Sequence, residues 1–166
     1  MDRKPYNILV LCTGNSARSI LGEALFNTLG AGRFQAYSAG SHPSGRVNPF
    51  AIEQLQVMGY PTESLRSKSW DEFAEADAPQ MDFVVTVCDN AAGEVCPLWP
   101  GHPVTAHWGF PDPASVEGSD EEKRAAFANT LRQIRHRVQL FLSLPLETLD
   151  HMALESQMRA IGKQPL

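Results

Sequence analysis

The chain has 166 residues, of which 43% are hydrophobic and 20% are charged, and its formal net charge is −5. This length fits one domain with a proper hydrophobic core, and nothing in the mildly acidic composition is basic enough to suggest a nucleic-acid surface, so we expect no nucleic-acid partner. No apolar run approaches the length of a membrane span, and no signal-type segment follows the N-terminal residues, so we expect a cytoplasmic protein without membrane contact. Three cysteines are too few, and odd in number, for a secreted disulfide framework, and in a reducing compartment they are more typical of catalysis or metal binding.

The first predicted element is a strand that leads into a short loop and then a helix. Residues 8–11 form an apolar run, which is typical of a buried parallel strand, and the run ends at Cys12. A helical pattern begins at Ser19. Loop N–H groups that precede a helix N-terminus form a concave site for a tetrahedral oxyanion. The residues expected to bind the anion are Thr13, Gly14, Asn15, Ser16, Ala17, Arg18 and Ser19.

Within this segment we assign separate roles to individual side chains. Cys12 is the candidate nucleophile, because a helix N-terminus favours the thiolate and lowers the pKa of a cysteine. Arg18 can close over the anion with two parallel hydrogen bonds, and Ser19 is placed to donate a hydrogen bond to the sulfur. Gly14 and Asn15 tolerate a positive φ. A lone cysteine at a strand end is often only a small buried apolar residue, but the ordered series of strand, cysteine, loop, arginine and helix favours the nucleophile.

The rest of the chain alternates between strands and helices. The patterns predict strands at 34–40, 82–88 and 104–108, and helices at 48–58, 70–76 and 119–142. This order indicates an α/β fold with a central four-stranded parallel sheet and helices on both faces. We expect one catalytic domain over residues 1–143. The extension at 144–166 is either an additional packed helix or a mobile tail.

Ligands of such sheets bind beyond the carboxyl ends of the strands, where both Cys12 and Cys88 lie. Asp112 follows in a loop between Pro111 and Pro113, which restrict its backbone. An aspartate in this setting is either a turn residue or, beside an oxyanion nucleophile, a general acid that protonates the departing oxygen.

The other two cysteines, Cys88 and Cys96, are eight positions apart. This is neither a Cys-x-x-Cys pair nor a usual zinc spacing. On a helix they would lie about 12 Å apart along the axis, whereas a disulfide needs Cα atoms within about 7 Å. A bond between them therefore requires the segment to unwind. Two alternatives are unrelated buried thiols and a metal site completed by His102 or His107.

The motifs resemble those of a known family. The Cys-x5-Arg-Ser loop at residues 12–19 and the Asp-Pro loop at Asp112 are similar to those of low-molecular-weight protein tyrosine phosphatases, over roughly residues 6–142. The additional Cys88 and Cys96, with the segment 107–113, resemble the arsenate reductases of the same fold.

This resemblance implies a relay of three cysteines that reduces arsenate to arsenite and so detoxifies it. Cys12 would attack arsenate held by the loop and Arg18, while Asp112 protonates the departing hydroxyl. Cys88 would then attack the Cys12 sulfur and expel arsenite, and Cys96 would form a Cys88–Cys96 disulfide. An external thiol donor, thioredoxin or else glutaredoxin with glutathione, would reduce that disulfide, with no tightly bound cofactor.

Some members of the family bind potassium near the loop, through residues that match Asn15, Glu23, Ser38 and an aspartate. The position of the aspartate corresponds to Lys68 here. A lysine ammonium can take the place of the cation, so we expect no required metal.

Two other functions compete with arsenate reduction. A tyrosine phosphatase with two incidental thiols would need a site for an aromatic ring, and no clear tyrosine pair lies near Asp112 to flank one. Weak phosphatase activity is nevertheless expected, because the same groups serve both reactions. An oxyanion-binding module without turnover would need no resolving thiols. We expect a monomer, because the pattern shows no large apolar patch.

Overall fold

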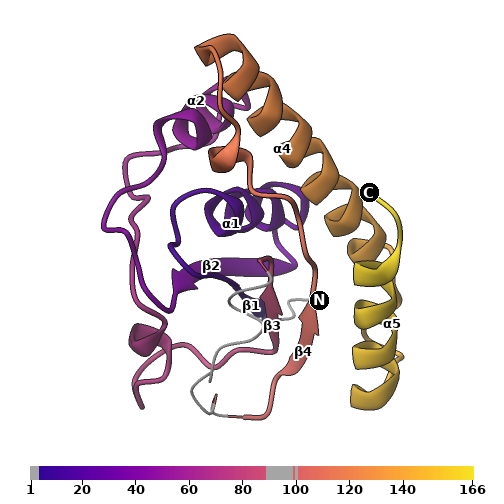
Figure 1. The fold of residues 1–166 in the computed structure, drawn as a ribbon. Coiled ribbons are helices and arrows are strands. Elements are labelled where there is room, and N and C mark those ends of the chain that lie inside the picture. The colour runs from indigo at the N-terminus through magenta and orange to yellow at the C-terminus, as the bar shows by residue number, and fades with distance from the viewer. Residues whose placement is uncertain (1–3, 89–98, 100) are drawn as a thin grey trace.

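The computed structural model describes residues 4–88, 99 and 101–166. Its centre is one sheet of four parallel strands in the order β2-β1-β3-β4 (Figure 1). The strands are β1 at Tyr6–Cys12, β2 at Phe34–Gly40, β3 at Phe83–Thr86 and β4 at Val104–His107. The four-stranded parallel sheet expected from the sequence is confirmed.

The helices also follow the expected order. The described α-helices are α1 at Arg18–Leu29, α2 at Pro49–Val57, α4 at Asp120–Leu142 and α5 at His151–Lys163. Two short 3-10 helices are η1 at Trp70–Phe73 and η2 at Pro113–Ser115. Where a helix was expected at 70–76, the chain forms only the shorter η1. None of the helices in the described ranges is long and apolar enough to cross a membrane.

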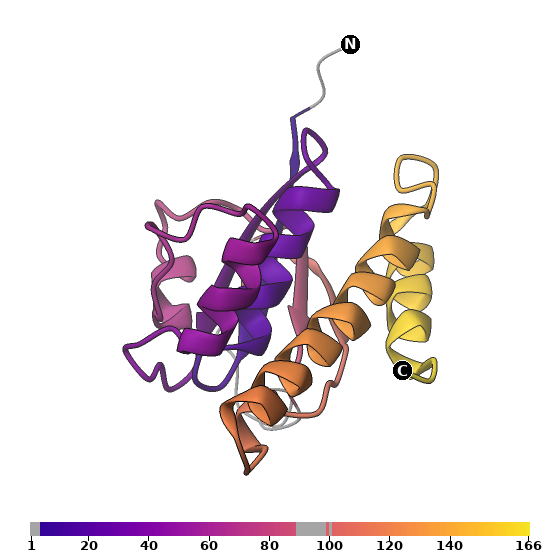
Figure 2. The same cartoon turned by 90° about the horizontal axis from the view of Figure 1, so that it is seen from above.

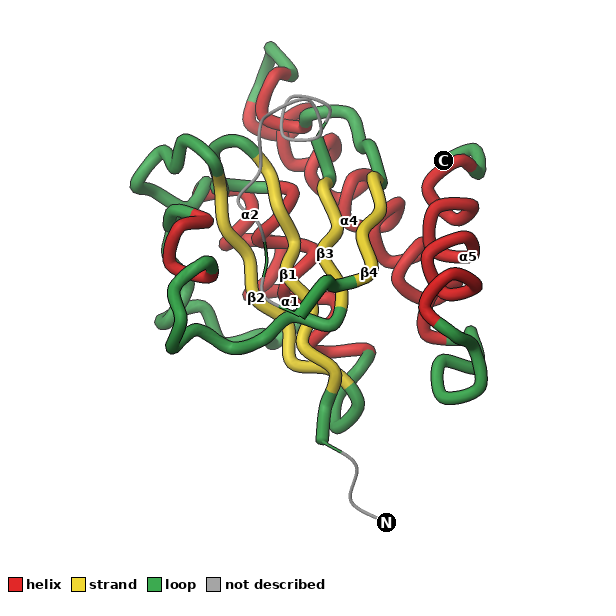
Figure 3. The backbone as a smooth tube through the Cα atoms, turned by 90° about the horizontal axis from the view of Figure 1, so that it is seen from below, coloured by secondary structure: helices red, strands yellow, loops and turns green. Residues whose placement is uncertain are grey.

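The two faces of the sheet carry alternate residues of β1. Ile8 and Val10 belong to the main core under α1 and α4, whereas Leu9 and Leu11 belong to a smaller cluster with η1 on the other face. Figures 2 and 3 show α1, α2 and α4 together on one side of the sheet. Among the described residues, the second face is covered by η1 and adjacent loops rather than by a long helix.

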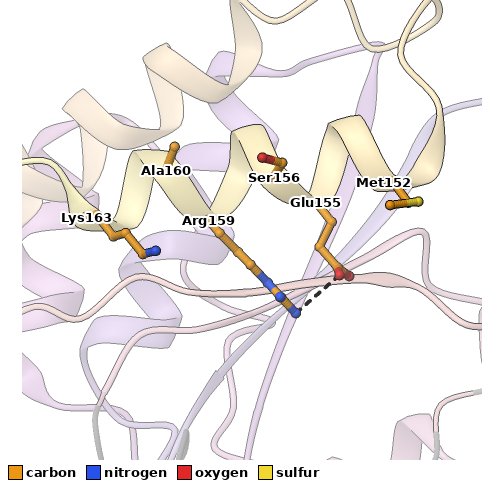
Figure 4. Close-up of a pocket in the computed structure, with 6 residues that line it drawn as sticks. All are labelled: Met152, Glu155, Ser156, Arg159, Ala160 and Lys163. Carbon is orange, nitrogen blue, oxygen red and sulfur yellow. Dashed lines mark ion pairs between the residues drawn. The ribbon is translucent and has the colours of Figure 1, made fainter.

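The extension at 144–166 contains a helix, which packs along the edge strand β4. Glu155 accepts a hydrogen bond from the backbone N–H of Thr105 (3.3 Å), and Arg159 Nε donates to the carbonyl of Thr105 (3.2 Å). Figure 4 shows Glu155 and Arg159 side by side on α5, joined by an ion pair of 3.3 Å. Met158 and Ile161 from α5 join the main core. These contacts satisfy backbone groups that an edge strand otherwise leaves open.

Candidate active site

The loop between β1 and α1 is held in shape by the loop that follows β2. Three of its carbonyl groups accept backbone hydrogen bonds: Thr13 from His42 (2.9 Å), Gly14 from Ser44 (2.9 Å) and Ser16 from Asn48 (2.8 Å). In a trans peptide the N–H points opposite to the C=O. The N–H groups that follow these carbonyls therefore point away from residues 42–48. This arrangement suits the expected oxyanion-binding loop, and the clamp by residues 42–48 was not predicted from the sequence.

Close approach of β2 to this loop depends on Gly40. A Cβ atom there would clash with the carbonyl oxygen of Thr13 and come within 3.0 Å of the Asn15 nitrogen. The backbone N–H of Gly40 donates to the carbonyl of Lys68 at 2.9 Å. Gly40 was expected only to end a strand, because one sequence cannot show which backbone lies opposite a glycine.

Asn15 is the residue of the loop that takes the left-handed conformation, with φ 47°, whereas Gly14 does not have a positive φ. Asn15 is fully buried. Its side chain accepts from the backbone N–H of Lys68 (2.9 Å) and donates to Ser19 Oγ (2.8 Å). The described contacts contain no hydrogen bond from Ser19 to the Cys12 sulfur, and the contact they give the Ser19 hydroxyl is the one it accepts from Asn15. Ser19 thus supports the loop through Asn15.

The parallel register brings Cys88 to Cys12. Leu11 pairs with Thr86, so a continuation of two residues places Thr13 beside Cys88. The Cys88 sulfur lies 3.3 Å from the backbone nitrogen of Thr13, whose N–H donates to it, and 3.5 Å from Thr13 Oγ1. Cys12 and Cys88 are both buried. The nucleophile and the first resolving thiol of the expected relay therefore occupy the same site.

The pKa of Cys12 is raised in this arrangement, not lowered as the sequence suggested. The main cause is its hydrogen bond with Cys88, and burial adds to it, while the charge of Arg18 and the N–H of Thr13 act in the opposite direction. Two neighbouring sulfurs share protons, because a thiolate at one opposes deprotonation of the other. Helix α1 begins close to the loop as expected, but the hydrogen bond with Cys88 and burial raise the pKa.

The side chains of Arg18, at the end of the anion loop, and Asp112 lie close together. Arg18 Nη1 donates to the carbonyl of Phe110 at 2.9 Å, and its Nη2 lies 3.7 Å from Asp112 Oδ2. The other carboxylate oxygen, Oδ1, accepts from the N–H of Ala114 at 2.9 Å and so caps η2. One carboxylate oxygen therefore fixes the loop, and the other faces the arginine. Cys96, the remaining expected catalytic residue, lies outside the described residues.

A charged pair that is largely but not fully buried lies behind the loop, at the residues compared with a potassium site. Ser38 Oγ donates to Glu23 Oε1 at 2.6 Å, and Lys68 Nζ lies 3.8 Å from the same oxygen. Burial raises the pKa of Glu23 and lowers the pKa of Lys68, and each of the two charges opposes the shift of the other. The ammonium already supplies the positive charge that a cation would bring, so these residues do not fit a potassium ion. Among the described residues, no group of three or more His, Cys, Asp or Glu side chains is arranged to hold a metal.

The chain is similar to known proteins over most of its length. The family model for low molecular weight phosphotyrosine protein phosphatases matches residues 7–155. An arsenate reductase of Halalkalibacterium halodurans is 39% identical over 134 residues, which cover 81% of this chain and 93% of that protein.

Two solved structures extend the comparison to the fold. An arsenate reductase in the phosphate binding state is 25% identical with a TM-score of 0.61, and the match covers 81% of this chain and 97% of that one. A thioredoxin-dependent arsenate reductase of Corynebacterium glutamicum is 22% identical with a TM-score of 0.55, over 84% of this chain and 65% of that one. At this identity, the second structure shows a shared fold.

Proposed function

The chain belongs to the low molecular weight phosphotyrosine protein phosphatase family and is an arsenate reductase, and from this premise we propose that it works by a relay of Cys12, Cys88 and Cys96. The observation that carries the proposal is the position of the Cys88 sulfur, held by Thr13 at 3.3 Å beside the buried Cys12. A thiol that only packed in the core would have no need to lie against the anion loop.

In the first step Cys12 passes its proton to an oxygen of the bound arsenate and attacks arsenic as the thiolate, and a bond from arsenic to oxygen breaks. Asp112 gives its proton to the departing oxygen, which leaves as water, while Arg18 and the loop N–H groups hold the remaining oxygens. The position of Asp112 supports this role, because the carboxyl oxygen that does not cap η2 lies 3.7 Å from the arginine expected to hold the anion.

In the second step Cys88 attacks the Cys12 sulfur. A disulfide forms, the bond from sulfur to arsenic breaks, and its electron pair stays on arsenic, which is reduced from As(V) to As(III) and leaves as arsenite. Cys96 then attacks Cys88, and the Cys12 thiolate departs. The Cys88–Cys96 disulfide takes two electrons from an external dithiol. Thioredoxin is the proposed donor, in line with the name of the Corynebacterium relative, and a cytoplasmic location would supply it.

The test separates single from multiple turnover. Pre-reduced protein without a donor should form one arsenite per molecule in the wild type and in Cys96→Ser, but none in Cys88→Ser or Cys12→Ser. With thioredoxin, its reductase and NADPH, only the wild type should turn over repeatedly. Arsenite formation by Cys88→Ser at the wild-type rate would contradict the relay. Continued turnover by Cys96→Ser would assign the resolution of Cys88 to an external thiol.

A second activity, weak hydrolysis of aryl phosphates, is favoured by the same arrangement of Cys12, Arg18 and Asp112. A phosphoryl group has the tetrahedral geometry that the loop accepts. Cys88→Ser should keep this hydrolysis while it loses arsenite formation, and Cys12→Ser should lose both.

A further inference from the structure

Arg137 is a buried arginine on α4 that contacts the loop carrying Asp112. Its side chain is 4% exposed. Nη1 donates to the carbonyl of Gly109 at 2.9 Å, and the guanidinium carbon lies 4.7 Å from the centre of the Phe110 ring. Nη2 donates to the carbonyl of Gln164 at 3.0 Å, just beyond α5. Arg137 therefore joins three segments: α4, the acid loop and the end of α5.

This arginine is costly for the fold. Burial lowers the pKa of Arg137, and its Nε has no hydrogen-bond partner within the described residues. A buried charge without a carboxylate partner is expensive, and an apolar side chain of similar volume is often no less stable. Packing alone therefore does not account for an arginine here, whereas its two carbonyl contacts fix the path of the acid loop.

The contacts of Arg137 lead directly to the catalytic groups. The ring of Phe110 packs against Arg137, and the carbonyl of the same residue accepts from Arg18 Nη1 at 2.9 Å. Arg18 in turn lies 3.7 Å from Asp112. A shift of this loop would move both the arginine anchor and the acid.

The end of α5 supports the same loop from its other side. Trp108 Nε1 donates to the carbonyl of Met158 at 2.9 Å. A Cβ atom at Gly162 would clash with the carbonyl oxygen of His107. Helix α5 therefore docks closely on the two residues that precede Gly109.

We propose that Arg137 is a positioning residue for arsenate reduction and that it holds the Gly109–Asp112 loop in its active position. The carbonyl of Gln164 at the end of α5 completes the binding site of its guanidinium. This inference rests on the proposed role of Asp112 as the acid. The C-terminal extension then supports catalysis without contacting arsenate.

The first test is Arg137→Lys, with Arg132→Lys on the exposed side of the same helix as the control. A lysine can reach one carbonyl but cannot bridge two or lie flat on a ring. Single-turnover arsenite formation at saturating arsenate should fall about tenfold in Arg137→Lys, because small displacements of an acid are costly. The arsenate concentration at half-saturation should change less than the rate, and Arg132→Lys should match the wild type. A wild-type rate in Arg137→Lys would overturn the inference.

A double-mutant cycle tests whether Arg137 acts through the acid. Asp112→Asn alone should slow arsenite formation by about 100-fold. Addition of Arg137→Lys to Asp112→Asn should then cause a further loss clearly smaller than tenfold, because only the part that acts through the Phe110 anchor of Arg18 remains. If the double variant instead shows the product of the two single losses, the positioning role of Arg137 is overturned and the acid role of Asp112 stands. A wild-type rate in Asp112→Asn would instead overturn the acid step of the proposed function.

A second variant leaves Arg137 in place. Gly162→Ala should push α5 away from His107 and slow arsenite formation, and the slowing should again be smaller in the Asp112→Asn background. Ser156→Ala, on the exposed side of α5, is the control. If Gly162→Ala slows arsenite formation equally with and without Asp112, α5 only stabilises the fold. That result would contradict its role in positioning Arg137.

Discussion

Cys88 affects the protonation of Cys12 through the hydrogen bond between the two side chains. Because the hydrogen bond with Cys88 is the main cause of the raised Cys12 pKa, Cys88→Ala should lower that pKa. More Cys12 is then thiolate at a given pH, and alkylation of Cys12 near neutral pH should accelerate by about tenfold if the pKa falls by one unit. The measurement is the rate of iodoacetamide labelling against pH, with the modified residue identified by mass spectrometry. An unchanged midpoint would show that burial, not Cys88, controls the thiol.

Lys68 is expected to neutralise Glu23 in the largely buried pair behind the loop. Lys68→Ala leaves a nearly buried carboxylate without its partner, at a cost on the order of 2–3 kcal/mol in the free energy of unfolding. Burial raises the Glu23 pKa above 4.5, and loss of the Lys68 charge should raise it further. The cost should therefore be full above the Glu23 pKa of the variant and shrink as the pH falls from there toward the lower pKa of the wild type, because the variant's carboxyl becomes neutral. Urea unfolding at several pH values measures this, with the exposed Lys163→Ala as the control. A loss independent of pH would argue that the Lys68 stem, not its charge, stabilises the fold.

The same pair predicts that the wild type needs no potassium. Its melting temperature and turnover should be equal in potassium and sodium salts of the same ionic strength. A clear gain in potassium would contradict the assignment of Lys68 as the internal cation.

At the scale of elements, the end of β2 and the loop after β1 depend on each other. Gly40→Ala places a methyl group against the Thr13 carbonyl, and displacement of a packed backbone typically costs about 1–3 kcal/mol. If that cost falls on the loop, affinity for phosphate should drop by about 10- to 100-fold. Isothermal titration with inorganic phosphate measures the change, with Gln35→Ala at an exposed position of the same strand as the control. Wild-type affinity in Gly40→Ala would mean that the loop does not rely on this contact.

At the scale of the whole molecule, α5 is expected to unfold together with the sheet. Met158 is fully buried in the main core, whereas Met152 on the same helix is 81% exposed. Met158→Ala should cost about 2–5 kcal/mol and lower a single unfolding transition, while Met152→Ala should have almost no effect. Thermal unfolding followed by tryptophan fluorescence and by circular dichroism tests whether the two signals move together. Separate transitions would show that residues 144–166 form an independent appendage.

The amino-acid sequence by itself determined the strand, loop and helix around Cys12, because these features depend on neighbouring residues and their periodicity. It also determined the parallel sheet and the candidate roles of Arg18 and Asp112, through motif and order. Only the tertiary structure decided which distant groups meet: Cys88 lies against Thr13 across 75 positions, and Arg18 reaches the Phe110 carbonyl across 92.

The expectation that the pKa of Cys12 falls was wrong because it, too, depends on groups that are distant in the sequence. The helix N-terminus is visible in the sequence, but the neighbouring sulfur and the burial that oppose it arise only when β3 pairs with β1. The hydrogen bonds that hold the anion loop, and those that hold Arg137, are likewise accepted by backbone carbonyls, which every residue carries. A single sequence cannot distinguish those carbonyls, so only the folded chain decides which of them act.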